Sequence, residues 1–185
     1  MSDFDSGVLP DWVADVVDWG RPLADDDERM GLAIELAARN VDAGTGGPFG
    51  AIVVDAGDGR LLGVGMNRVV PMGNSLLHAE VVAIMGAQGR VASFTLADRP
   101  RELHASCAPC AMCLGATHWS GVTRLVCGAT REDAESLGFD EGPVFDESYS
   151  YLERHGIEVV HGIRREEAAE VMQTYLDRGG PIYNP

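Results

Sequence analysis

The sequence predicts an α/β protein in which helices cover both faces of a central five-stranded mixed sheet, a three-layer α/β/α sandwich. Apolar runs of strand length alternate with segments whose apolar residues follow helical spacing, a pattern typical of such folds. A GDG turn at 57–59 lies between two apolar runs and predicts a hairpin. The chain of 185 residues has a natural size for one domain, and its hydrophobic fraction of 45% is enough for one core.

We expect residues 1–23 to form an N-terminal extension and residues 24–185 to form a single domain. The apolar residues of the extension predict a short helix that packs on the body of the protein: Trp12, Val13, Val16, Val17 and Trp19. Pro22 is expected to end this helix, because proline interrupts the backbone hydrogen bonds of a helix interior.

The elements of the domain begin with Asp25, Asp26 and Asp27, whose charges favour the start of a helix. A glycine-rich turn at 44–50 leads from this helix into the first strand. The predicted strands are 51–55, 61–67, 102–106, 122–129 and 157–162. The further predicted helices are 78–88, a helix with Pro109 in its first turn, 131–138 and a last helix that begins near 164 and ends at glycines.

Two short stretches carry the residues suited to chemistry, LLHAEVV (76–82) and SCAPCAMCLG (106–115). Cys110 and Cys113 stand at C-x2-C spacing at a predicted helix start. There two thiolates can share one metal, and free backbone N–H groups stabilise their charge. A tetrahedral zinc site needs at least one further ligand, and His78 at a second helix start is the best candidate. We therefore expect one Zn²⁺ per chain.

Glu80 favours a catalytic zinc site over a structural one. A structural zinc has four protein ligands, whereas a catalytic zinc leaves one position for water. A carboxylate two residues from His78 can take a proton from that water and return it to a leaving group. The neighbouring thiol of Cys107 leaves a structural zinc site open as the alternative, because a fourth protein ligand would occupy the position that a catalytic zinc leaves for water. Without that role, Cys107 is expected to be a small buried residue.

The order of these motifs resembles the signature of the cytidine deaminase-like zinc deaminases. His78-Ala-Glu80 corresponds to their His-x-Glu, and Pro109-Cys110-Ala-Met-Cys113 corresponds to their Pro-Cys-x-x-Cys. The resemblance implies the cytidine deaminase-like fold and a zinc-dependent aminohydrolase that releases ammonia from a cyclic amidine.

Within that superfamily the sequence is most similar to bacterial guanine deaminases and related nucleoside deaminases. The segments that carry this similarity are GGPFGAIVV, the Asn67 that ends a strand, PCAMCLGA and GFDEG. The resemblance implies guanine or a guanine-like base as substrate and a homodimer as the assembly. Ala108 departs from the pattern, because these enzymes usually carry a glutamate before Pro-Cys.

The same resemblance implies roles for residues around the base. Asn67 would bind the base edge, Phe49 and Trp119 would pack against the ring, and Ala79 would help to position it. Glu141, with Asp140 as the next match, would handle the exocyclic amine beside Glu80. Tyr183 would close the site.

Composition limits the alternatives. A formal net charge of −15 argues against a nucleic-acid partner and so against a tRNA adenosine deaminase, which shares the motifs. A nucleoside deaminase acting on guanosine or cytidine, a cytosine deaminase and a structural zinc module stay open. The N-terminus is acidic and no apolar run approaches the roughly 18 residues of a membrane span, so we expect a cytoplasmic protein without a membrane partner.

Overall fold

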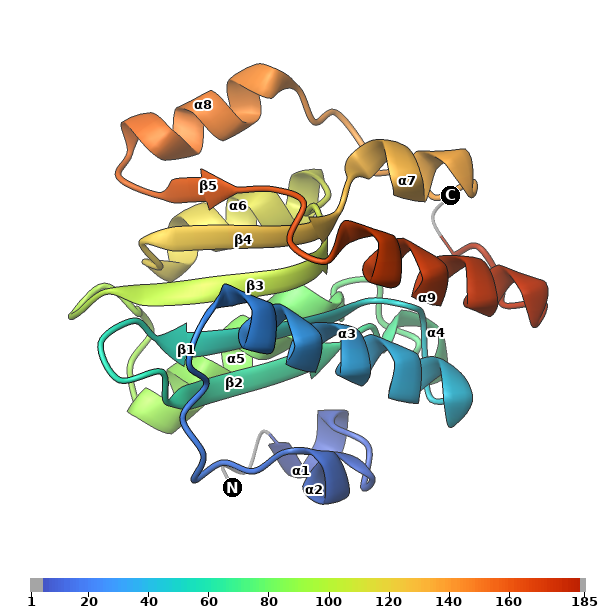
Figure 1. The fold of residues 1–185 in the computed structure, drawn as a ribbon, viewed down its shortest axis with the longest axis horizontal. Coiled ribbons are helices and arrows are strands. Elements are labelled where there is room, and N and C mark those ends of the chain that lie inside the picture. Colours follow the sequence, from blue (N-terminus) through green and yellow to red (C-terminus); the bar gives the residue numbers. More distant parts are fainter. Residues whose placement is uncertain (1–4, 184–185) are drawn as a thin grey trace.

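The computed structural model describes residues 5–183 and shows a five-stranded mixed sheet between two layers of helices (Figure 1). The strand order is β2-β1-β3-β4-β5. Its members are β1 (Gly50–Asp55), β2 (Leu61–Met66), β3 (Arg101–Cys107), β4 (Arg124–Ala129) and β5 (Glu158–Val160). Strand β1 runs antiparallel to β2 and β3, while β3, β4 and β5 are parallel. The predicted fold class is confirmed.

The helices of the described residues include three that the sequence reading missed. They are α1 (Asp5–Val8), α2 (Val13–Val16), α3 (Asp26–Asp42), α4 (Val69–Met72), α5 (Ala79–Val91), α6 (Ala111–Ser120), α7 (Arg131–Ser136), α8 (Asp146–Arg154) and α9 (Arg165–Asp177). Helices α1, α4 and α8 were not predicted. Helix α8 is largely polar and buries only Leu152 fully, so it offers few apolar residues to mark it in the sequence. Strand β5 is shorter than predicted.

The two helical layers divide the core. Helices α5 and α6 cover one face of the sheet, and α3 and α9 cover the other (Figure 1). Ala83 and Leu114 represent the first layer in a cluster with the buried β3 residue Leu103. On the other face Met30 and Met172 pack with Val126 of β4. The sheet is therefore covered on both faces, and its open end is where loops can form a site.

The extension packs on the outer part of the sheet. Val13, Val17 and Leu23 are buried in one cluster with residues of β1 and β2 such as Ile52 and Val64. The predicted short helix and its packing are confirmed, whereas the division of the chain at residue 23 stays a prediction. Among residues 5–183, no helix has the length and apolar character to cross a bilayer.

A buried ionic network joins α3 to the sheet. Glu102 of β3 accepts hydrogen bonds from Arg29 at 2.8 Å and His104 at 2.9 Å, and Arg124 approaches it at 3.3 Å. Arg124 also forms a bidentate pair with Asp26 at 2.7 and 2.8 Å. Each buried charge thus has an opposite partner, which offsets the cost of removing it from water.

Helix α5 lies unusually close to strand β2, backbone against backbone. A Cβ atom on Gly65 would lie 2.0 Å from the carbonyl oxygen of Ala79, and one on Gly63 would lie 2.2 Å from that of Ala83. Glycine is needed at both positions because any side chain would push the helix away. The approach fixes the start of α5, directly after His78, close against the sheet.

We expect Gly65→Ala to destabilise the fold by about 1–3 kcal/mol, because the added methyl group forces backbone shifts in a packed core. Gly115→Ala is the control, since a Cβ at this α6 position has no described atom within 4 Å. Alanine favours the helix there and should stabilise the protein by roughly 0.5–1 kcal/mol. Urea denaturation of both variants measures the difference. Equal stability of Gly65→Ala and the wild type would contradict the steric argument.

Candidate active site

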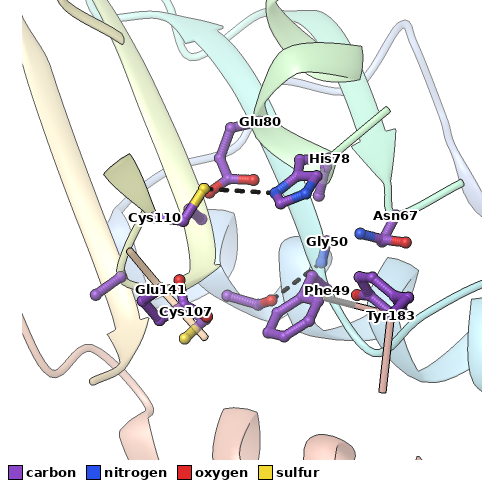
Figure 2. Close-up of a pocket in the computed structure, with 13 residues that line it drawn as sticks. Phe49, Gly50, Asn67, His78, Glu80, Cys107, Cys110, Glu141 and Tyr183 are labelled. Carbon is purple, nitrogen blue, oxygen red and sulfur yellow. Dashed lines mark hydrogen bonds between the residues drawn. The ribbon is translucent and has the colours of Figure 1, made fainter. Parts of the chain in front are cut away.

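The two sequence motifs meet at the end of the sheet, each at a helix start. His78 is the N-cap residue of α5, Cys110 is the N-cap residue of α6, and Cys113 lies in the first turn of α6. The Cys110 Sγ and His78 Nδ1 atoms lie 3.5 Å apart (Figure 2). One ligand atom from each of the three residues lies within 4.8 Å of the others. The start of α5 at His78 is confirmed, whereas Pro109 precedes α6 and does not lie in its first turn as predicted. The two motifs meet although they are separated by about thirty residues in sequence.

This donor set fits zinc. Two sulfur atoms and one imidazole nitrogen are ligands that Zn²⁺ prefers, and three protein ligands leave a position open for water. Hydrogen bonds with Cys113, and then with His78, lower the pKa of Cys110 to about 4. The thiolate is the form that binds a metal. The geometry therefore corresponds to the catalytic rather than the structural class of zinc site.

Cys107 lies near the three candidate ligands but is oriented differently. It lines the adjoining cavity, and its Sγ contacts the carbonyl oxygen of Thr130 at 3.6 Å. Burial raises the pKa of its thiol well above the ordinary value. Among residues 5–183, the metal-binding cluster that includes Cys110 does not include Cys107. These contacts favour a buried neutral thiol.

Two buried carboxyl groups face the cluster. Glu80 is 8% exposed in the first turn of α5, and its carboxylate lies beside Cys110 (Figure 2). Burial, followed by the negative charge on Cys110, raises the pKa of Glu80 to about 6. The same two causes raise the pKa of Glu141 to about 8. The Glu141 carbonyl oxygen accepts the Ala111 N–H at 3.0 Å, which holds its loop against the start of α6.

A cavity next to the cluster brings together most residues predicted to bind the base. Its lining includes Phe49, Asn67, Ala79, Glu80, Glu141 and Tyr183, together with Gly50, Ser106, Cys107 and Ala108, which sequence reasoning did not assign to the substrate. A wider mouth of about 320 Å³ adjoins it. The mouth is lined by Asp140, which lies outside the inner cavity and whose Oδ1 accepts the Gly142 N–H at 2.8 Å.

Asn67 presents an amide nitrogen to this cavity. Its Oδ1 accepts a hydrogen bond from the Val69 N–H at 3.2 Å, which fixes which end of the amide faces the backbone. Figure 2 shows the Nδ2 end on the side of His78. A ligand with a hydrogen-bond acceptor on its edge would match this donor.

Aromatic rings form one wall. Phe49 packs edge-on against Phe139 at 5.1 Å between centroids, and Phe139 packs against Tyr183 at 5.7 Å. The Tyr183 hydroxyl is buried without a hydrogen-bond partner among the described residues. Sequence reasoning did not single out Phe139, although it stands inside the GFDEG segment. Flat apolar walls with few polar groups suit a planar heterocycle.

Trp119 lies outside the cavity of this chain, so its packing against the base stays a prediction. Its side chain is 80% exposed and does not line the cavity of this chain. Trp119 comes six residues after Cys113 in α6. At 3.6 residues per turn, its side chain points roughly 120° away from that of Cys113, so the indole faces outward. It contacts His118 instead, at 4.8 Å between ring centroids.

The fold and site define a zinc-dependent hydrolase in which a buried carboxylate lies beside the metal position. Residues 23–129 match the cytidine and deoxycytidylate deaminase zinc-binding region. The chain therefore belongs to this family, and it is a zinc-dependent hydrolytic deaminase.

Several relatives are similar over most of the chain. The solved guanine deaminase from Nitrosomonas europaea is 39% identical, with a TM-score of 0.86 over 90% of this chain and 93% of that one. The guanine deaminase of Bacillus subtilis (strain 168) is 39% identical over 62% of this chain and 71% of its own length. A tRNA-specific adenosine deaminase of Haemophilus influenzae is 30% identical over 83% of this chain and 84% of its own length.

We expect Cys107→Ala to keep one zinc per chain, because its thiol is directed toward Thr130 rather than toward the cluster. Cys113→Ala is the matched variant and should lose most of the metal, since it removes one of three candidate ligands. Elemental analysis of both purified proteins measures the zinc content. Loss of zinc in Cys107→Ala would identify it as a fourth ligand and contradict the open site.

Proposed function

We propose that this protein deaminates guanine or a closely related aminopurine. The observation that carries the proposal is the buried Glu80, which lies beside Cys110 and lines the same cavity as the candidate ligands His78 and Cys110. Two relatives are guanine deaminases. A solved relative that is 40% identical, with a TM-score of 0.89 over 95% of this chain and 94% of that one, holds 2,6-diaminopurine.

In this proposal His78, Cys110 and Cys113 hold the zinc. When bound, zinc supplies the Lewis acidity that activates water near neutral pH. Glu80 accepts a proton from the attacking water and passes it to a ring nitrogen. Oxygen adds to the carbon that carries the amino group. Glu80, assisted by Glu141, then takes the remaining proton from the added oxygen and delivers it to the amine. The C–N bond breaks, a C=O bond forms at that carbon and ammonia leaves.

The other residues bind and orient the base. The Nδ2 of Asn67 donates to an acceptor on the base edge, and Phe49 packs on the ring. Tyr183 closes the cavity, and its buried hydroxyl can bond to a polar atom of the substrate. The backbone at Ala79 helps to position the base, while Asp140 lies at the mouth and can contact groups that enter or leave.

The alternative substrates differ in what surrounds the base. Guanosine and cytidine carry a sugar that must fit beside Tyr183 or in the mouth, whereas a free base does not. A tRNA substrate would bring many phosphates to a protein with a net charge of −15. These features favour a free base, and an assay across these substrates distinguishes them.

We also propose a cytoplasmic location and a homodimer. All four cysteines are free thiols, which a reducing compartment preserves. Trp119 and Tyr151 leave an exposed aromatic surface on α6 and α8 that a second copy could cover. Light scattering on the purified protein measures the assembly, and a monomer at all concentrations would contradict the dimer.

We expect Glu80→Gln to lower ammonia release from guanine by at least roughly 10²–10⁴-fold, because glutamine cannot transfer the proton. Zinc should stay bound, since Glu80 is not among the candidate ligands. Glu153→Gln removes an exposed carboxylate from α8 and should keep wild-type activity. The measurement is ammonia release from guanine, guanosine, adenine, cytosine and cytidine. A fully active Glu80→Gln enzyme would refute the role of Glu80, and wild-type inactivity on guanine would refute the substrate.

A further inference from the structure

We propose that Asn40 is a positioning residue for the base-binding cavity, and that Trp12 of the N-terminal extension holds it in place through Thr45. The inference rests on the proposed function, because the cavity walls that Asn40 supports are those assigned to the base. Asn40 itself lies near the end of α3 and does not line the cavity.

The Asn40 side chain has a defined partner for each of its polar atoms. It is fully buried, and its Nδ2 donates to the carbonyl oxygens of Gly47 at 2.8 Å and Asn67 at 2.9 Å. Its Oδ1 accepts the Thr45 hydroxyl at 2.8 Å. Rotating the amide by 180° would place Oδ1 against two carbonyl oxygens, which cannot donate to it. The side chain is therefore held in one orientation.

These bonds join two walls of the cavity. The Gly47 N–H also donates to the Asn67 carbonyl at 3.2 Å, so Asn40 and Gly47 together fix the backbone of the residue that faces the base edge. Gly47 also adjoins Tyr183, since a Cβ at this glycine would lie 2.5 Å from the tyrosine hydroxyl. Shifting Asn40 would thus move the Asn67 amide and the backbone behind Tyr183 together.

The approach depends on the lack of a side chain at Gly46. A Cβ there would lie 2.0 Å from the Asn67 carbonyl oxygen and 2.7 Å from the Asn40 Nδ2. The glycine-rich turn therefore leaves room for the Asn40 amide to reach both carbonyl groups.

The extension reaches this amide through Thr45. The Trp12 Nε1–H donates to the Thr45 Oγ1 at 3.1 Å, while the single hydroxyl hydrogen of Thr45 serves Asn40. Arg68, one residue after Asn67, donates from Nε to the Val8 carbonyl at 3.0 Å and from Nη1 to the Thr45 carbonyl. Two routes thus connect residues of the extension to the cavity wall.

The test uses the full-length zinc-loaded protein with variants along this chain of bonds. Asn40→Asp keeps the acceptor for Thr45 but places a carboxylate oxygen against two carbonyl oxygens. We expect the KM for guanine to rise about tenfold or more, with a smaller change in kcat. The Kd of the guanine analogue 8-azaguanine should rise by a similar factor. Trp12→Phe and Thr45→Val should raise both constants less. Zinc content should stay at the wild-type value.

Two matched variants separate positioning from general destabilisation. Thr45→Ser keeps the hydroxyl and should retain the wild-type KM. Thr45→Val lacks the hydroxyl and should raise KM. Thr123→Val makes the same change at a residue directly before β4, whose hydroxyl donates to the Arg101 carbonyl at the start of β3. It should leave KM unchanged.

A double-mutant cycle tests whether Asn40 acts through Asn67. In an Asn67→Ala background, Asn40→Asp should raise KM by a clearly smaller factor than in the wild type, because the amide it positions is gone. Equal factors in both backgrounds would overturn the inference, as would an unchanged KM in Asn40→Asp.

Hydrogen exchange separates this inference from the proposed function. Asn40→Asp should speed exchange at the Gly47 amide, whose bond to the Asn67 carbonyl is weakened, whether or not guanine is the substrate. If wild-type protein releases no ammonia from guanine, the proposed substrate fails and exchange decides the inference. Unchanged exchange at Gly47 would then overturn it.

Discussion

The close contact between helix α5 and strand β2 is the constraint on which the site depends. Two glycines in the strand let the backbone of the helix approach to a distance that no side chain would permit. The approach fixes how closely α5 packs on the sheet, and the first residues of α5 carry the site, with His78 at the cap and Glu80 in the first turn. Helix α6 begins after β3 in the same sheet, so that the two helix starts, and the ligands they carry, meet at one end of the sheet.

Placing the cluster at two helix starts has an electrostatic consequence. Unpaired backbone N–H groups and the positive ends of the helix dipoles favour negative charge, which suits thiolate ligands. The carboxyl groups nearby are in the opposite situation. Burial beside a thiolate disfavours their charged forms, so the pKa values of Glu80 and Glu141 rise to about 6 and 8. Carboxyl groups of this kind can hold and release a proton near neutral pH.

The cavity walls depend on contacts that are distant in sequence. Asn67 is held by Asn40, 27 residues earlier, and Thr45 is held by Trp12 across 33 residues. The aromatic wall of Phe49 and Tyr183 is supported from behind by Phe139, so three separate segments meet there. A surface extension and a terminal segment thus contribute to the cavity although neither carries a candidate zinc ligand.

The sequence alone determined the class of chemistry, the mixed five-stranded sheet and the helix starts at His78 and Cys110. These features follow from short-range rules: ligand type and spacing, apolar periodicity, and glycine or proline at element ends. The largely polar helix α8 was missed because so little of it is buried. Only the tertiary structure showed that Trp119 faces outward, that Phe139 packs behind Phe49 and Tyr183 of the cavity wall, and that Asn40 joins Gly47 to Asn67. Such contacts form between segments far apart in the chain, where side-chain direction and packing depend on the whole fold rather than on local spacing.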